Sequence, residues 1–147
     1  MAAQRRVLII DPDPRERRSL VHSLKEEPYF IDTGKSLPEA IKKVSGGGFD
    51  CLVMDTNLPE MKGYEAIPIL KNLDPDLKII MTTKKNTKPL EAKVRKQDIF
   101  FYFIKSFGND ELRMALKSAF NPRKEGLDMN KKPKILVIDD DPDFCAA

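Results

Sequence analysis

Short apolar runs alternate with longer amphipathic segments along this chain of 147 residues. Most of these runs are nearly continuous in apolar character, as in strands that are covered on both faces of a sheet. Their alternation with segments of helical periodicity is typical of βαβ units and predicts an α/β protein with a parallel sheet. We expect five strands, at residues 7–10, 29–32, 49–54, 77–81 and 99–104, and the weaker second one is expected at an edge.

A helix is expected after each strand, and several helix starts carry capping residues. Asp13 and Pro14 provide an N-cap and a proline at the first helical position, and Glu16 follows three residues after the cap. Ser36 and Asn109 are the expected caps of the second and the last helix. The third and fourth helices are expected over about residues 64–73 and 89–96.

Composition narrows the class of protein. Apolar residues make up 41% and charged residues 33% of the chain, which is typical of a globular domain. No apolar run approaches the roughly 20 residues that cross a bilayer, and Val7 to Ile10 are too few for a signal peptide. We therefore expect a cytoplasmic protein with no membrane contact. The net charge of +3 is too small to indicate nucleic-acid binding, and Cys51 and Cys145 suggest no disulfide framework.

Four polar residues stand at the predicted strand ends. Asp11, Asp55, Thr83 and Lys105 follow or close the first, third, fourth and fifth strands. Open α/β sheets bind ligands in the crevice beyond the carboxyl ends of their strands, so we expect one shared site. Two neighbouring carboxylates repel each other unless a cation or a lysine lies between them, and Mg²⁺ suits an all-oxygen site. Such a site suits a carboxylate that accepts a phosphoryl group.

With these residues in place, the chain resembles a response-regulator receiver domain over about residues 5–120. The most specific motif is Met54-Asp55-Thr56-Asn57-Leu58-Pro59-Glu60-Met61-Lys62-Gly63, which is similar to the family's loop after its phosphoacceptor aspartate. The resemblance implies a flavodoxin-like (βα)5 three-layer sandwich with strand order 2-1-3-4-5. It also implies a regulatory phosphoacceptor of two-component signalling, with at most self-catalysed phosphoryl transfer and dephosphorylation.

The resemblance assigns roles to individual residues. Asp55 would be the phosphoacceptor, and Asn57 would offer its backbone carbonyl to the Mg²⁺ ion that Asp11 and Asp55 hold. Thr83 would bind the phosphoryl group. Lys105 would pair with that group, and Tyr102 would be the aromatic residue whose rotamer follows activation. These last roles make Thr83 and Tyr102 the expected switch residues.

Two departures from the family pattern concern the same site. The family carries two adjacent acids after its first strand, whereas this chain reads Asp11-Pro12-Asp13, so Mg²⁺ affinity is expected to be reduced. Asp13 is either a substitute metal ligand or, as we favour, only the N-cap of the first helix. Lys84 replaces the small residue that the family has after the threonine, and it either crowds the phosphoryl site or adds charge to it.

The chain also contains the start of an internal repeat. Lys134 to Asp143 repeat the pattern of Arg6 to Pro14, and the given sequence ends at Ala147. We expect a receiver domain at residues 1–121, a linker at 122–133, and the first strand and acidic loop of a second receiver at 134–147.

The expected partners are a histidine kinase or phosphotransfer protein and a downstream module of the full-length protein. A dimer through the fourth helix, fifth strand and fifth helix is a further expectation.

Two other functions remain open at this point. One is a degenerate receiver that binds partners without phosphorylation, which Pro12 and Lys84 favour. The other is a phosphatase similar to the haloacid dehalogenases, with Asp11 in Asp11-Pro12-Asp13 as nucleophile, although that interpretation leaves the Asp55 loop unexplained.

Overall fold

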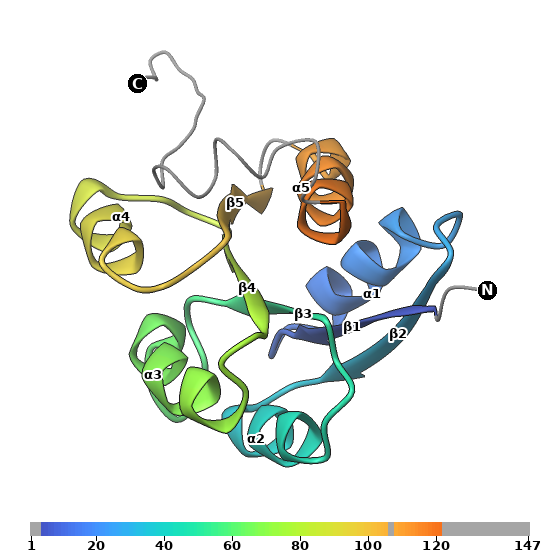
Figure 1. The fold of residues 1–147 in the computed structure, drawn as a ribbon. Coiled ribbons are helices and arrows are strands. Elements are labelled where there is room, and N and C mark those ends of the chain that lie inside the picture. The colour runs from blue at the N-terminus through green and yellow to red at the C-terminus, as the bar shows by residue number, and fades with distance from the viewer. Residues whose placement is uncertain (1–3, 106–107, 122–147) are drawn as a thin grey trace. The chain divides into compact units, whose positions relative to one another are not determined.

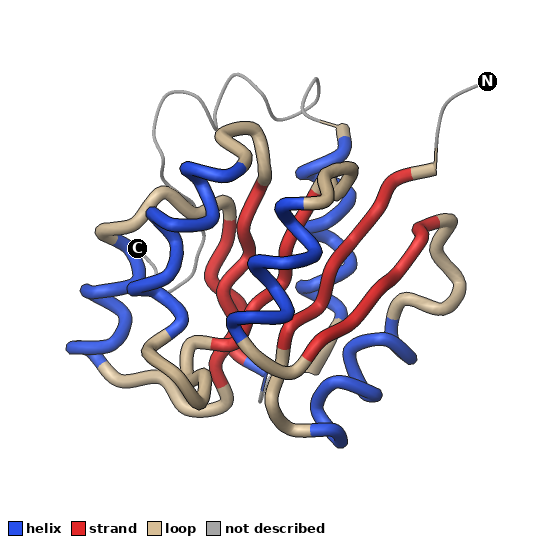
Figure 2. The backbone as a smooth tube through the Cα atoms, turned by 90° about the horizontal axis from the view of Figure 1, so that it is seen from below, coloured by secondary structure: helices blue, strands red, loops and turns tan. Residues whose placement is uncertain are grey.

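The structure, a computed structural model, describes residues 4–105 and 108–121. The sheet in this part of the chain is wholly parallel and has the order β2-β1-β3-β4-β5. Figure 2 shows its strands in red between the blue helices. The predicted order and the edge position of the second strand are therefore confirmed. The strands are β1 (Arg5–Ile10), β2 (Tyr29–Gly34), β3 (Cys51–Asp55), β4 (Lys78–Thr83) and β5 (Phe101–Ile104).

Each strand is followed by a helix, as the sequence pattern predicts. The helices are α1 (Pro14–Ser23), α2 (Leu37–Ser45), α3 (Gly63–Leu73), α4 (Lys88–Arg95) and α5 (Asp110–Phe120). The side chain of Asp13 accepts a hydrogen bond from the Arg15 N–H at 2.9 Å, and Ser36 caps α2 in the same manner. The fourth helix starts one residue earlier than expected because the Thr87 hydroxyl caps it, accepting from the Leu90 N–H at 3.2 Å.

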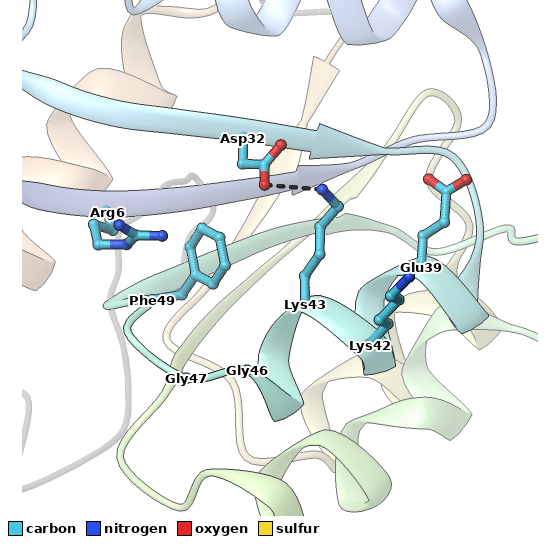
Figure 3. Close-up of a pocket in the computed structure, with 8 residues that line it drawn as sticks. All are labelled: Arg6, Asp32, Glu39, Lys42, Lys43, Gly46, Gly47 and Phe49. Carbon is cyan, nitrogen blue, oxygen red and sulfur yellow. Dashed lines mark hydrogen bonds and ion pairs between the residues drawn. The ribbon is translucent and has the colours of Figure 1, made fainter.

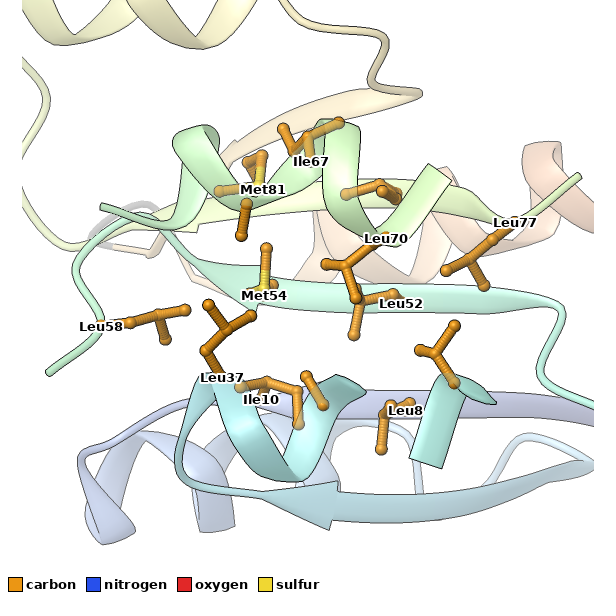
Figure 4. Packing of buried hydrophobic residues seen from close by; sticks show 14 of the residues in the cluster. Leu8, Ile10, Leu37, Leu52, Met54, Leu58, Ile67, Leu70, Leu77 and Met81 are labelled. Atoms are coloured by element: carbon orange, nitrogen blue, oxygen red, sulfur yellow. The ribbon is translucent and has the colours of Figure 1, made fainter. Parts of the chain in front are cut away.

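Helices cover both faces of the sheet (Figure 1). Alternate strand residues point to opposite faces, and one set, which includes Leu8, Leu52 and Met54, packs against α2, α3 and α4 (Figure 4). The other set faces α1 and α5, whose Leu20 and Leu116 are 1% and 0% exposed. Burying one such side chain contributes about 1.5–3 kcal/mol, so both layers hold the strands in register.

By its internal contacts the chain divides into two units, Met1–Leu116 and Lys117–Ala147. All five strands and their carboxyl-end loops belong to the first unit. The predicted linker at 122–133 and the predicted repeat at 134–147 lie outside the described residues. Within the described part of the chain, no helix has the length and apolar character needed to span a membrane.

Candidate functional site

Three of the predicted site residues meet at the carboxyl ends of β1, β3 and β5. The Lys105 ammonium lies between two carboxylates, with its Nζ 2.7 Å from Asp11 Oδ2 and 3.1 Å from Asp55 Oδ1. The parallel order places β1 and β3 side by side, which brings residues 44 positions apart in sequence, Asp11 and Asp55, to the same edge of the sheet. We call Asp11, Asp55 and Lys105 the charged triad.

The charged triad is withdrawn from solvent. The side chains of Asp11, Lys105 and Asp55 are 2%, 6% and 12% exposed. A charge in such surroundings requires partners of opposite sign and further hydrogen bonds. The triad therefore forms one electrostatic unit in which the loss of Lys105 would leave both carboxylates without their shared cation.

Backbone and hydroxyl donors satisfy the remaining carboxylate atoms. Asp11 Oδ1 accepts from the Asp13 N–H at 3.0 Å, and Asp55 Oδ2 accepts from the Asn57 N–H at 2.9 Å. The Thr82 hydroxyl donates to Asp55 Oδ1 at 3.4 Å. These bonds fix the two carboxylates relative to the loops that follow β1 and β3.

The pKa values of the triad follow from this burial. Desolvation raises the pKa of Asp55 above its ordinary value, and the charge of Asp11 adds to the rise, although Lys105 and the Asn57 N–H oppose it. For Lys105, burial alone lowers the pKa, but the hydrogen bond with Asp11 and the charge of Asp55 outweigh burial and raise it. Lys105 therefore remains charged at neutral pH and acts as the fixed cation of the site.

The loop after Asp55 is held against the site at both of its ends. The Gly63 N–H donates to the Thr56 carbonyl at 2.7 Å, and a Cβ atom on Gly63 would lie 2.2 Å from the backbone oxygen of Asp55. Only glycine allows this close approach. In the middle of the loop Leu58 is buried, and Glu60 Oε1 accepts from the Leu37 N–H at 3.1 Å. The loop thus joins the start of α2 to the start of α3.

Thr83 and Tyr102, the predicted switch residues, are buried, and their hydroxyl groups donate to partners other than the Asp55 carboxylate. The Thr83 hydroxyl donates to the Lys85 carbonyl at 3.1 Å, and the Tyr102 hydroxyl donates to Asn86 Oδ1 at 2.6 Å. Burial, the largest cause, raises the pKa of Tyr102, so its hydroxyl keeps its proton and remains a donor. Both residues therefore hold the segment after β4.

The oxygen ligands at the site are of the type that a hard divalent cation prefers, but the strand ends supply only two carboxylates. Asp11 and Asp55 supply carboxylate oxygens on either side of one ammonium group, and Mg²⁺ prefers oxygen ligands and keeps several waters. Pro12 has no side-chain donor, and Asp13 caps α1 through Arg15. Among the described residues, no group of three or more acidic, histidine or cysteine side chains has metal-binding geometry.

Three residues at the site were not predicted from the sequence. Thr82, rather than Thr83, contacts Asp55, because Thr82 is the register partner of Asp55 across β3 and β4. Arg17 Nη1 donates to the Asp11 carbonyl at 2.6 Å. Glu16 Oε1 lies 3.6 Å from Lys105 Nζ. The position of Glu16 in the first turn of α1, directly after the β1 end, is the sequence signal that identifies it.

A second charged region lies along α2 and the edge strand β2, away from the charged triad. It is a hollow of about 450 Å³, lined by residues that include Arg6, Asp32, Lys43 and Phe49 (Figure 3). We call it the α2 hollow. Lys43 Nζ lies 2.9 Å from Asp32 Oδ2, and the Arg6 guanidinium stacks 4.9 Å from the centre of the Phe49 ring. None of the predicted site residues lines it.

Comparison with known proteins identifies the class. Residues 7–117 match the response regulator receiver domain family, so the chain belongs to this family. The predicted flavodoxin-like fold, the receiver identity and the place in two-component signalling are thereby confirmed, whereas the roles of single site residues stay predictions. The family match favours this interpretation over the phosphatase alternative.

Individual relatives agree with the family. The chain is 28% identical over 115 residues to the DNA-binding transcriptional regulator NtrC of Azospirillum brasilense, covering 78% of this chain and 24% of that protein. It is 31% identical to the response regulator TrrA of Thermotoga maritima, which was solved in complex with Mg²⁺ and BeF. The TM-score is 0.71, and the match covers 79% of this chain and 99% of the TrrA chain. The receiver domain in the beryllofluoride-activated NtrC4 dimer is also 31% identical. Its TM-score is 0.73, and the match covers 79% of this chain and 96% of the NtrC4 chain.

Proposed function

We propose that Asp55 accepts a phosphoryl group from the phosphohistidine of a partner kinase or phosphotransfer protein. The observation that carries this proposal is the contact of the Asp55 carboxylate with the Lys105 ammonium, at 3.1 Å, in a chain of the receiver family. A carboxylate oxygen of Asp55 attacks the phosphorus atom, the new O–P bond forms as the P–N bond of phosphohistidine breaks, and the imidazole leaves. Lys105 then offsets the charge on the transferred phosphoryl oxygens.

The same proposal assigns a divalent cation to Asp11, Asp55 and the backbone carbonyl of Asn57. When bound, Mg²⁺ would neutralise charge on the incoming phosphoryl oxygens. Asp11 holds Lys105 in place, and Arg17 fixes the Asp11 backbone through its carbonyl. Asp13 is committed to the α1 cap, which supports a weaker cation site than two adjacent acids would give.

Thr83 and Tyr102 are the proposed readout of phosphorylation. Tyr102 is tied to Asn86, and Asn86 Nδ2 donates to Glu91 Oε1 at 3.1 Å, so the tyrosine is connected to the first turn of α4. A movement of the Thr83 hydroxyl from the Lys85 carbonyl toward a phosphoryl group at Asp55 would release the segment that carries Asn86. The exposed face of α4, β5 and α5 would then change, and this face is the proposed dimer surface.

The whole protein's role is part of the proposal, because the chain spans 24% of NtrC and 45% of the Mycobacterium tuberculosis regulator TcrA, its curated relatives. Both relatives are named as transcriptional regulators. We propose that this receiver likewise controls a downstream module, with a histidine kinase as its input.

Intact-mass spectrometry after incubation with acetyl phosphate and Mg²⁺ tests the chemistry. We expect the mass of one phosphoryl group to be added to the wild type and to Asp76→Asn, a matched change at an exposed aspartate, but not to Asp55→Asn. Equal labelling of Asp55→Asn would contradict the assignment. No labelling of the wild type, together with phosphorylation-independent partner binding, would instead support the degenerate receiver that Pro12 and Lys84 favour.

A further inference from the structure

Two oppositely charged side chains from distant segments meet at the rim of the charged triad. Lys84, the residue after β4, places its Nζ 3.7 Å from Glu16 Oε2 and 3.8 Å from Asp13 Oδ2. The other oxygen of Glu16, Oε1, lies 3.6 Å from Lys105 Nζ. The Glu16 carboxylate therefore lies between two ammonium groups, one buried and one at the surface.

We propose that Lys84 is a positioning residue that acts as an internal counter-cation: it ties the segment after β4 to the start of α1 and opposes divalent-cation binding at the site. This inference rests on the proposed function, because it concerns the cation that Asp11 and Asp55 would hold. It also assigns to Glu16 a role in attracting that cation when Lys84 is removed.

The charge balance supports this role. Four carboxylates, from Asp11, Asp13, Glu16 and Asp55, share the site with the ammonium groups of Lys84 and Lys105. Removing Lys84 changes the net charge of this group from minus two to minus three. A divalent cation gains twice the Coulomb energy of a monovalent ion from that change, at the dielectric of a protein surface.

The position of Lys84 makes the effect local. Its side chain is 65% exposed, so its ion pairs contribute little to folding, and their main consequence is to keep the positive charge at the rim. The site already lacks a carboxylate at position 12, which is Pro12. Asp13 and Glu16, the two acidic residues that could attract a cation further, are both paired with Lys84. Pro12 and Lys84 thus act in the same direction.

Mg²⁺ titration of the full chain, followed by amide NMR shifts around residues 55–57 and 83–86, tests the inference. We expect Lys84→Ala to lower the Mg²⁺ dissociation constant about five- to tenfold, since one unit charge is removed near a divalent ion. The matched control is Lys93→Ala, which removes the same charge from an exposed position on α4 and should change the constant less than about twofold. An unchanged constant in Lys84→Ala, or an equal gain in Lys93→Ala, would overturn the inference.

A double-mutant cycle tests the route through Glu16. If the ion pair carries the effect, the gain from Lys84→Ala should fall by at least half on a logarithmic scale in a Glu16→Gln background. A full gain in that background would show that Lys84 acts only as a general surface charge, which overturns the proposed link to α1.

The titration and the mass measurement separate this inference from the proposed function. A wild type that accepts no phosphoryl group, beside a Lys84→Ala variant with tighter Mg²⁺ binding, would overturn the proposed function alone. Phosphorylation of Asp55 with an unchanged Mg²⁺ constant in Lys84→Ala would overturn the inference alone. Absence of any Mg²⁺ response in both wild type and Lys84→Ala would also overturn it, since removal of Lys84 should strengthen binding.

Discussion

The charged triad and the α2 hollow contain similar ion pairs in different surroundings. Lys105 and Asp11 are 2.7 Å apart with side chains 6% and 2% exposed, whereas Lys43 and Asp32 are 2.9 Å apart with side chains 33% and 35% exposed. Water screens the second pair and hardly reaches the first. In the triad three charged groups share one buried space, whereas each side chain of the pair in the hollow is about a third exposed. Burial of the ion pair therefore distinguishes the candidate site from the α2 hollow.

The largest expected effect comes from removing the cation of the charged triad. Lys105→Ala leaves the carboxylates of Asp11 and Asp55 buried beside each other without their cation. We expect the free energy of unfolding, measured by urea denaturation in metal-free buffer, to fall by about 3 kcal/mol. Combining it with Asp55→Asn should restore part of the loss, because one uncompensated charge disappears. A loss below about 1 kcal/mol would mean that the triad is no more than a surface ion pair.

A smaller effect of opposite sign is expected at Asp55. Since burial raises its pKa, the ionised carboxylate is less favourable in the folded state than in the unfolded chain, and Asp55→Asn should stabilise the protein by about 1 kcal/mol at neutral pH. As the pH falls through the folded-state pKa, wild-type Asp55 binds a proton and the advantage of the variant should shrink. Urea denaturation at neutral pH and near pH 4 measures this difference. Asp76→Asn, which changes an exposed aspartate, should show no advantage at either pH.

The smallest effect is expected in the α2 hollow. Lys43→Ala removes the partner of Asp32. In the wild type, burial alone would raise the pKa of Asp32, but Lys43 and the Thr33 N–H outweigh burial and lower it. Because both side chains are about a third exposed, we expect a loss near 0.5 kcal/mol that declines further in 1 M salt. A loss comparable with that of Lys105→Ala, or one independent of salt, would remove the contrast between the two regions.

Much of the architecture could be predicted from local sequence features. The apolar run Val7 to Ile10 and the cap at Asp13 specify a buried strand and the helix after it, and the structure has both with small shifts at their ends. The Asp55 loop was recognisable by its resemblance to the family's loop, in which Pro59 fixes the backbone and Gly63 permits a close approach to Asp55. The family assignment therefore followed from short-range patterns.

The detailed contacts of the site depended on register and could not be predicted in the same manner. The choice between Thr82 and Thr83 as neighbour of Asp55 follows from the pairing of β3 with β4, and a shift of one residue would reverse it. Glu16 reaches Lys105 only because α1 packs beside β5's end, 89 positions away in sequence. The pairing register leaves no local pattern, and the place of Glu16 after β1 indicates that it lies near the site but not that it reaches Lys105.

The sequence by itself determined the succession of strands and helices along the chain, the caps at Asp13 and Ser36, and the set of polar residues at strand ends, because these depend on side-chain periodicity and on neighbours along the chain. Only the tertiary structure decided which of those residues share one ammonium group, and that Lys84 and Glu16 join them. Coulomb interactions and desolvation act through space between residues far apart in sequence, so their balance is fixed only when the strands are aligned and the helices are packed.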